Sequence, residues 1–255
     1  MPAPRPTALI TGATAGLGAE FAQQLAITRH DLILVARDVS RLRAKAVRLH
    51  QDFGIHVEVL PADLLTDSGV AAVSARLADA DRPVSVLVNN AGFGLVKAFE
   101  DNDVTAQSEQ LRILVTTPME LMHAALGPML VRGEGRIINV ASMAGFVPRG
   151  TYGASKAWVI SFSRWANLRY RPRGVTVTAV CPGFVHTEFH QRMGASVKKV
   201  PQWMWLNPDQ VVREGLADSA AGKAVSVPSR RYTALATLSR LAPPSWAAAA
   251  GNRGR

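Results

Sequence analysis

Short apolar runs recur along the chain, and longer segments in which apolar residues follow helical spacing separate them. The runs are rich in Val, Ile and Leu and show little polar alternation, which is typical of strands buried on both faces. The expected strands are 7–11, 31–36, 55–60, 84–88, 135–140, 175–180 and 224–227. Strands that alternate with helices predict an α/β fold: a doubly wound parallel sheet of about seven strands with helices on both faces.

The segments between these strands are expected to be helical at the glycine-rich 12–28, at 39–53, 66–80, 104–131 with Pro118 as an interruption, 152–171 and 207–220. Residues 190–206 lack a clear core pattern. They carry Met193, Trp203, Met204 and Trp205, which predict an apolar lid over a pocket.

A glycine-rich turn, T-G-A-T-A-G-L-G at 11–18, joins the first strand to the helix after it. Glycines let the backbone approach a pyrophosphate, and the helix N-terminus adds N–H donors and a positive dipole end. The turn therefore indicates a Rossmann-like dinucleotide site. The structural alternative is a tight turn that serves only close packing of helix on strand.

Two residues follow the second strand at the position where a dinucleotide's ribose is bound. Arg37 suits a 2′-phosphate, which favours NADP(H) over NAD(H). Asp38 is the competing ribose ligand, or the N-cap of helix 39–53. Asp63 follows the third strand and is expected at the adenine edge, with a helix cap as the alternative.

Tyr152 and Lys156 stand four residues apart, on one face of a predicted helix. A phenol titrates near ~10, and a nearby ammonium group favours the phenolate. A Tyr tuned in this way can exchange a proton with a carbonyl or hydroxyl oxygen. The pair alone is also compatible with an exposed helix face.

Chemistry-bearing residues gather at the carboxyl ends of the predicted strands: Gly12, Arg37, Asp63, Asn89 and Ser142. Ligands of open α/β sheets bind beyond these ends. We therefore expect these residues to form one site.

The composition narrows the setting of this site. With 255 residues and 48% hydrophobic content, the chain can bury one large core. Its single cysteine, Cys181, excludes an intrachain disulfide and favours a reducing compartment. It shows no apolar run long enough for a membrane span and no signal-peptide pattern. A cytoplasmic location is predicted, and no metal site is expected.

The net charge is +10, and the stretch from His190 onward holds ten Lys or Arg against three acids. A solvated basic face explains this. Because Leu235, Leu238 and Leu241 share one predicted helix face, weak contact of the basic tail with anionic membrane surfaces is the alternative. Nucleic-acid binding lacks the motifs of the usual modules.

Taken in order, these motifs resemble the short-chain dehydrogenase/reductase family. They are T-G-x-x-x-G-x-G at 11–18, N-N-A-G at 89–92, a Ser after the fifth strand, Y-x-x-x-K at 152–156, and P-G followed by Thr187. The resemblance covers about 7–228. The sequence around residues 135–145 and that of the C-terminal tail are similar to bacterial ketoacyl and lipid reductases.

The resemblance implies an NADP(H)-dependent oxidoreductase that transfers a hydride to a carbonyl, or from an alcohol, on a 3-ketoacyl or other apolar substrate. Tyr152 would be the proton donor or base. Lys156 would bind the nicotinamide ribose and lower the pKa of Tyr152, and Ser142 would bind the substrate oxygen. The implied cofactor contacts are Gly12, Ala13, Thr14, Gly16, Leu17, Gly18, Arg37, Asp63, Leu64, Asn89, Ala91, Gly92, Tyr152, Lys156, Pro182, Gly183 and Thr187.

The resemblance also implies an organisation. Residues 1–228 would be a single dinucleotide-binding catalytic domain with a substrate lid at about 185–206, and 229–255 a basic amphipathic tail. Members of the family often pair through helices that correspond to 104–131 and 152–171, so a homodimer or homotetramer is expected.

The chain departs from the family pattern at two places. Leu114 stands where the family usually has an Asn that holds a water linked to the Lys. Ser142 and Tyr152 are ten residues apart, and the family spacing is usually thirteen. An alternative function follows: an NADP(H)-binding regulatory protein with impaired catalysis.

Overall fold

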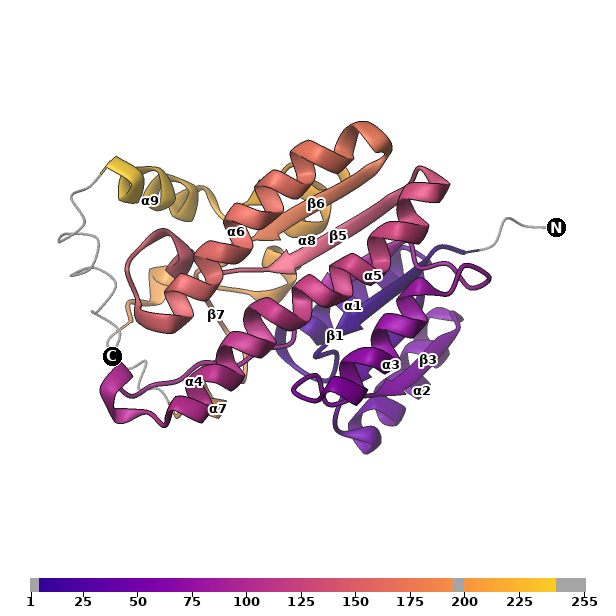
Figure 1. Ribbon diagram of the computed structural model, residues 1–255, viewed down its shortest axis with the longest axis horizontal. Helices are drawn as coiled ribbons and strands as arrows, with labels where there is room; N and C mark the ends of the chain where they lie inside the picture. The colour runs from indigo at the N-terminus through magenta and orange to yellow at the C-terminus, as the bar shows by residue number, and fades with distance from the viewer. Residues whose placement is uncertain (1–4, 195–199, 242–255) are drawn as a thin grey trace.

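The computed structural model describes residues 5–194 and 200–241 and is organised around a seven-stranded parallel sheet (Figure 1). The strand order is β3-β2-β1-β4-β5-β6-β9, which confirms the doubly wound fold. The strands are β1 Thr7–Thr11, β2 Asp31–Ala36, β3 Val57–Pro61, β4 Val86–Asn89, β5 Gly135–Val140, β6 Val175–Val180 and β9 Val225–Ser226. A small separate sheet pairs β7, Phe184–Val185, with β8, Trp205–Leu206.

Helices cover both faces of the sheet (Figure 1). They are α1 Gly16–Ile27, α2 Val39–Phe53, α3 Asp67–Ala78, α4 Val104–Leu111, α5 Thr117–Arg132, α6 Gly150–Tyr170, α7 Phe189–Arg192, α8 Pro208–Ala220 and α9 Arg230–Leu241. Short 3₁₀ turns lie at Phe99–Asp101, Met143–Phe146 (η3), Arg171–Arg173 and Gln202–Met204.

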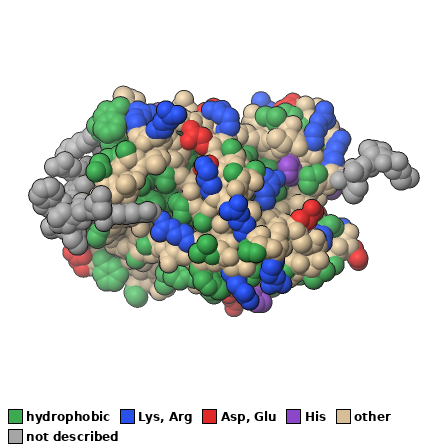
Figure 2. Space-filling model, turned by 90° about the horizontal axis from the view of Figure 1, so that it is seen from above, with side chains coloured by type: hydrophobic (Ala, Val, Ile, Leu, Met, Phe, Trp, Pro, Cys, Tyr) green, Lys and Arg blue, Asp and Glu red, His purple; other side chains and the backbone are tan. Residues whose placement is uncertain are grey.

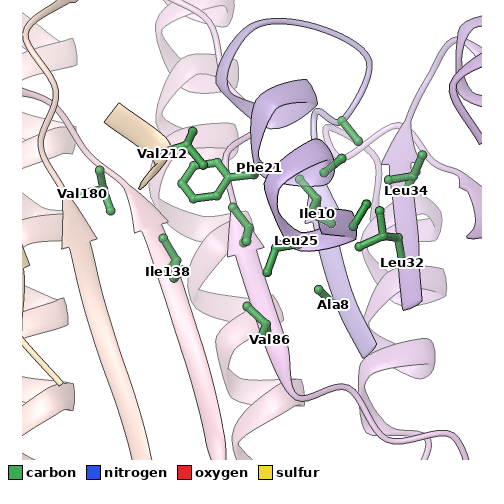
Figure 3. Close-up of a cluster of buried hydrophobic side chains, with 14 of the residues drawn as sticks. Ala8, Ile10, Phe21, Leu25, Leu32, Leu34, Val86, Ile138, Val180 and Val212 are labelled. Carbon is green, nitrogen blue, oxygen red and sulfur yellow. The ribbon is translucent and has the colours of Figure 1, made fainter. Parts of the chain in front are cut away.

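The apolar runs of the strands serve two cores, one on each face. Along β1, Ala8 and Ile10 face α1, where they meet Phe21 and Leu25 (Figure 3). Leu9 points to the other face, into the cluster under α3 and α5. Successive strand residues point to opposite faces, and both faces are covered. A central strand must therefore be apolar at every position, which explains the missing alternation.

The predicted helix 104–131 is not continuous, and its interruption lies before Pro118. Arg112–Thr116 forms a π-helical turn, η2, between α4 and α5. Pro118 stands in the first turn of α5, but helical backbone precedes it, so its missing N–H removes a donor within the run. Leu114 lies within the π turn. Turns of this kind occur mostly as single bulges, often at functional sites.

Two predicted strands begin later than the apolar pattern indicates. Ile55 and Val84 are buried but precede the ladders, which start at Val57 and Val86. Ile55 packs in the core on the α1 face and Val84 in the core on the opposite face, and neither is paired in the sheet. Burial and strand pairing are thus separate demands that an apolar run alone does not distinguish.

The C-terminal helix α9 is tied to the rest of the chain through Tyr232. Its hydroxyl donates to the Met204 carbonyl at 2.7 Å and accepts from the Phe184 amide at 3.1 Å. Its ring covers Gly183 so closely that a Cβ there would lie 1.9 Å from the ring. Leu235 and Leu238 are exposed. The boundary at 228 and the membrane contact of the tail stay predictions, and 242–255 lie outside the described residues.

The surface carries the basic excess in dispersed form. Figure 2 shows Lys and Arg side chains spread over one face among apolar, acidic and other groups. Among the described residues, no helix combines the length and apolarity needed to cross a membrane.

A buried histidine sits beside a guanidinium at the sheet end opposite the predicted site. His30 Nε2 lies 3.1 Å from Arg136 Nη2, and His30 Nδ1 lies 3.1 Å from Thr28 Oγ1. Because a guanidinium only donates, Nε2 must accept, and the imidazole is neutral. Burial, and then the charge of Arg136, lower the pKa of His30.

We predict that this histidine makes stability pH-dependent. Between the unfolded pKa of about 6.5 and the lowered folded pKa, the unfolded chain binds more protons, so the free energy of unfolding falls as pH falls. Urea unfolding of wild type and His30→Gln, measured from pH 8 to pH 5, checks this. The free energy of the wild type should drop more steeply below pH 6.5, and parallel curves would contradict the prediction.

Candidate active site

Helix α6 presents Tyr152 and Lys156 on the face that meets the end of β5. The Lys156 Nζ lies 5.7 Å from the centre of the Tyr152 ring. It is buried and donates to the Val140 carbonyl, the last of β5, at 2.6 Å. The four-residue spacing has thus placed both side chains one turn apart. The lysine is fixed by the sheet itself.

Ser142 meets Tyr152 despite the shortened spacing between them. Its side chain caps the 3₁₀ turn η3, where it accepts from the Ala144 amide at 3.1 Å, and its interaction with the Tyr152 phenol acts to lower the pKa of Tyr152. The loop between Ser142 and Tyr152 can be short because α6 already begins at Gly150, two residues before Tyr152. Gly145 and Gly153 let this loop press against α6: a Cβ on either would come within 3.0 Å of backbone.

The titration behaviour of the pair reflects their burial. Burial raises the pKa of Tyr152, and the Ser142 hydrogen bond and the charge of Arg149 only partly offset it. Burial also lowers the pKa of Lys156 to about 8. The expected lowering of the Tyr152 pKa is therefore not what this arrangement gives, because desolvation outweighs the groups that lower it. At neutral pH the phenol keeps its proton.

The glycine-rich turn is shaped as the dinucleotide interpretation requires. Gly12 and Gly16 have positive φ angles of 65° and 53°. A Cβ at Gly18 would lie 2.3 Å from the Gly12 carbonyl oxygen. Helix α1 starts without a side-chain cap and without an acid in its first turn, so its first N–H groups are open to an anion. Ala13, Thr14 and Leu17 complete the turn.

Two residues to which the sequence assigned no role hold this turn in place. Thr11 Oγ1 accepts from the amides of Asn90 at 2.9 Å and Ala91 at 3.0 Å. The Asn90 side chain donates back to the Thr11 carbonyl at 2.9 Å. The turns after β1 and β4 are therefore locked together. Thr11 and Asn90 lie inside the glycine-rich and N-N-A-G motifs, and this position in the sequence is the signal by which their role could have been predicted.

The structure separates the two candidates after β2. Arg37 is exposed at the strand end. Asp38 is the N-cap of α2, where it accepts from the Arg41 amide at 3.0 Å and from Ser40 Oγ at 2.6 Å. Hydrogen bonds from Arg41 and Ser40 lower the pKa of Asp38. The carboxylate of Asp38 is thus engaged as a cap.

The residues after β3 and β4 are partly turned inward. Asp63 Oδ1 accepts from the Leu65 amide at 3.1 Å, and Thr66 supplies the cap of α3 in its place. The Leu64 carbonyl accepts from Thr117 Oγ1 at 2.9 Å. Asn89 is buried and donates to Asn139 Oδ1 at 2.9 Å.

The loop after Asn89 brings backbone to the crevice. Gly92 is exposed there, and a Cβ on it would lie 2.6 Å from Leu114 Cδ2. Ala91 shares the wall of a small cavity with Leu114 and Lys156.

Residues 182–189, at the start of the predicted lid, lie near these strand ends. The Pro182 carbonyl accepts from the Met143 amide at 3.0 Å. Thr187 packs against the glycine turn, where a Cβ on Gly16 would lie 3.4 Å from it. The Phe189 and Tyr152 rings are 6.4 Å apart. Residues 195–199 of the predicted lid lie outside the described residues.

We predict that Gly18→Ala weakens dinucleotide binding, because its Cβ would push the Gly12 carbonyl out of place. Such overpacking costs about 1–3 kcal/mol of stability. Gly127 in α5 is the matched control, since a Cβ there meets nothing within 4 Å. Gly127→Ala should stabilise by about 0.5–1 kcal/mol. Thermal melts and cofactor titration check both. Equal behaviour of the two variants would contradict the prediction.

Comparisons with known proteins agree with this geometry. The family described as short chain dehydrogenase matches residues 6–198. The chain is 29% identical over 227 residues to a very-long-chain 3-oxoacyl-CoA reductase-like protein of Arabidopsis thaliana, covering 86% of this chain and 72% of that protein.

Two solved structures are similar over most of their length. One is a short-chain dehydrogenase from Sphingobium yanoikuyae in complex with NADPH, with 35% identity, a TM-score of 0.84 and coverage of 92% of this chain and 94% of that one. The other is a bulky-bulky ketone specific alcohol dehydrogenase from Comamonas testosteroni, with 30% identity, a TM-score of 0.80 and coverage of 92% of each chain. The chain belongs to the short-chain dehydrogenase family of NAD(P)-binding oxidoreductases.

Proposed function

We propose that this protein is an NADP(H)-dependent reductase of ketones on apolar, lipid-like chains, with 3-ketoacyl compounds as the leading substrate class. One observation carries the proposal: Lys156 lies one helical turn from Tyr152, with its Nζ 5.7 Å from the centre of the Tyr152 ring and bonded to the Val140 carbonyl, and Ser142 interacts with the same phenol at the end of β5. A proton donor, a hydroxyl that orients it and a cationic group thus share one strand end.

The roles of the side chains follow from their states. NADP(H), when bound, supplies or accepts the hydride. Ser142 orients the carbonyl oxygen. Tyr152 gives its proton to that oxygen, and its raised pKa keeps the proton in place at neutral pH, which suits reduction. Lys156, held by the Val140 carbonyl, is placed to bind ribose hydroxyls and to replace the proton.

The residues present fit the cofactor. The glycine turn presents a cradle that a Cβ at Gly18 would fill, and the open start of α1 suits a diphosphate. Arg37 is exposed at the end of β2, where a guanidinium suits a 2′-phosphate. The Sphingobium yanoikuyae relative was solved with NADPH.

The apolar substrate class is supported by the walls of the crevice. Phe189 stands beside Tyr152, and Met193 fills the space over Gly94, where a Cβ would lie 2.1 Å from its sulfur. Apolar side chains near the reacting phenol favour an alkyl chain over a sugar. Relatives named for 3-oxoacyl-CoA and for bulky ketones point the same way.

The assembly is proposed to be a homodimer or homotetramer in the cytoplasm. Exposed apolar side chains lie on the helices through which the family pairs: Leu111, Met119, Val131, Trp165 and Leu168. Burying them against a second copy would remove an apolar surface from water.

A regulatory NADP(H)-binding protein with impaired catalysis is the second candidate, and Leu114 favours it. Leu114 is buried in the core cluster and cannot bind a water as the family's usual Asn does. Cofactor binding without turnover would support this candidate.

We predict that Tyr152→Phe lowers kcat by about 10²–10⁴-fold with little change in KM, because it removes the proton donor. NADPH oxidation with a panel of 3-ketoacyl thioesters and bulky ketones measures this. Tyr170→Phe on the same helix is the control. If the wild-type protein turns over no ketone in the panel, the reductase proposal is wrong.

We predict that NADPH binds at least tenfold more tightly than NADH, about 1.4 kcal/mol. The charge-assisted contact of Arg37 with the 2′-phosphate supplies this difference. The double variant Arg37→Ala with Ala36→Asp should reverse the preference. Fluorescence titration of both cofactors checks it, and equal affinities in the wild type would assign Arg37 no part in selection.

A further inference from the structure

A small cavity lies between the ends of β4 and β5, the π turn and α6. It offers about 10 Å³ to the centre of a water molecule, which is about the room that one water needs. Its walls include Asn89, Leu114, Asn139, Val140, Lys156 and Val159. A space for one water thus lies against the cationic group of the site.

Asn89 has a buried hydrogen-bond acceptor without a partner. Its Oδ1 is buried and has no hydrogen-bond partner among the described residues. Its Nδ2 donates to Asn139 Oδ1 at 2.9 Å and to the Pro118 carbonyl at 3.5 Å. Both partners are acceptors there, because Asn139 Nδ2 is used on Ser163, so the amide cannot be flipped. A buried amide oxygen of this kind calls for a donor.

Lys156 supplies the second polar group of the cavity wall. Its ammonium carries three N–H donors, and one of them is used on the Val140 carbonyl. The remaining donors are available to a water and to a ligand. A buried ammonium is stabilised by each further acceptor, so a water beside it satisfies both residues.

Leu114 forms the apolar side of the same cavity. It stands in the π turn, where the family's Asn usually holds the water that links to the Lys. Its hydrocarbon side chain offers no hydrogen bond, so polar contacts must come from other groups that line the cavity. Asn89 is one of these residues.

We infer that one water is bound in this cavity, that it donates to Asn89 Oδ1 and accepts from Lys156 Nζ, and that Asn89 is the positioning residue for it in place of residue 114. This inference rests on the proposed function for its catalytic meaning. It deepens that function by giving the chain a proton supply that its Leu114 would otherwise deny.

The proton count closes without a further reagent. One proton leaves Tyr152 for the carbonyl oxygen of the substrate as the hydride reaches the carbon. One proton then passes from the Lys156 ammonium to the Tyr152 phenolate. The bound water returns one proton to the Lys156 amine and regains one from solvent.

The water itself is tested by a crystal structure of the wild-type protein with NADPH, at a resolution that shows ordered water. One water should lie about 2.7–3.2 Å from both Asn89 Oδ1 and Lys156 Nζ. A cavity closed by side chains, or a water that contacts neither atom, overturns the inference. This arm needs no turnover, so it stands even if no ketone is reduced and the proposed function fails.

The role of Asn89 is tested by a swap across the cavity. Asn89→Leu should lower kcat by about 10-fold or more with KM for the ketone nearly unchanged. Adding Leu114→Asn to that variant returns an amide to the cavity and should restore most of the loss. Leu114→Asn alone should change kcat less than about threefold, because the water is already held.

Ser163→Ala is the matched control, since it removes the hydroxyl at the far end of the Asn89–Asn139 chain but does not line the cavity. Its kcat should stay at the wild-type level. If Ser163→Ala lowers kcat as far as Asn89→Leu does, or if adding Leu114→Asn to Asn89→Leu does not restore kcat, Asn89 acts only through packing and the inference is wrong. A tenfold gain in Leu114→Asn alone overturns it as well. Should Asn89→Leu not fold, the crystal structure and this single variant decide.

Discussion

The site depends on the hydrogen bonds that join the turns after β1 and β4. These strands are neighbours in the sheet, yet their following chains lead to opposite sides of it, so a crevice opens between them. The Thr11 hydroxyl bridges the crevice floor by accepting from two amides of the next turn. The glycine turn, the start of α1 and the loop at Gly92 all take their positions from this junction.

Much of the fold was accessible from the sequence because central parallel strands are buried on both faces. Leu9 and Ile10 face different cores, and because both faces are buried, the strand sequence is an unbroken apolar run. The first residues of β3 and β4 were harder to predict, since Ile55 and Val84 are apolar because they pack in the core and not because they pair. The π turn at Arg112–Thr116 was missed because a single widened turn leaves the helical apolar spacing almost unchanged.

The site shows a similar division. Tyr152 and Lys156 could be placed together because helical spacing is local. The meeting of Ser142 with Tyr152 across a shortened loop could not be settled, because it depends on η3 and on an early start of α6. The pKa of Tyr152 was predicted in the wrong direction, since burial is a property of the fold and not of the Tyr–Lys spacing. Asn139 and Tyr232 act over many intervening residues, and no local pattern marks them.

The two hydrogen bonds of Tyr232 connect the C-terminal helix to the small sheet of β7 and β8. Its hydroxyl joins Phe184 of β7 to Met204 just before β8, and Tyr232 itself belongs to α9. Any outward swing of β8 must break this bridge or carry the C-terminal helix with it. Tyr232 therefore couples the position of β8 to the docking of α9. A ligand that holds β8 in place would slow amide hydrogen exchange in a helix that it never touches.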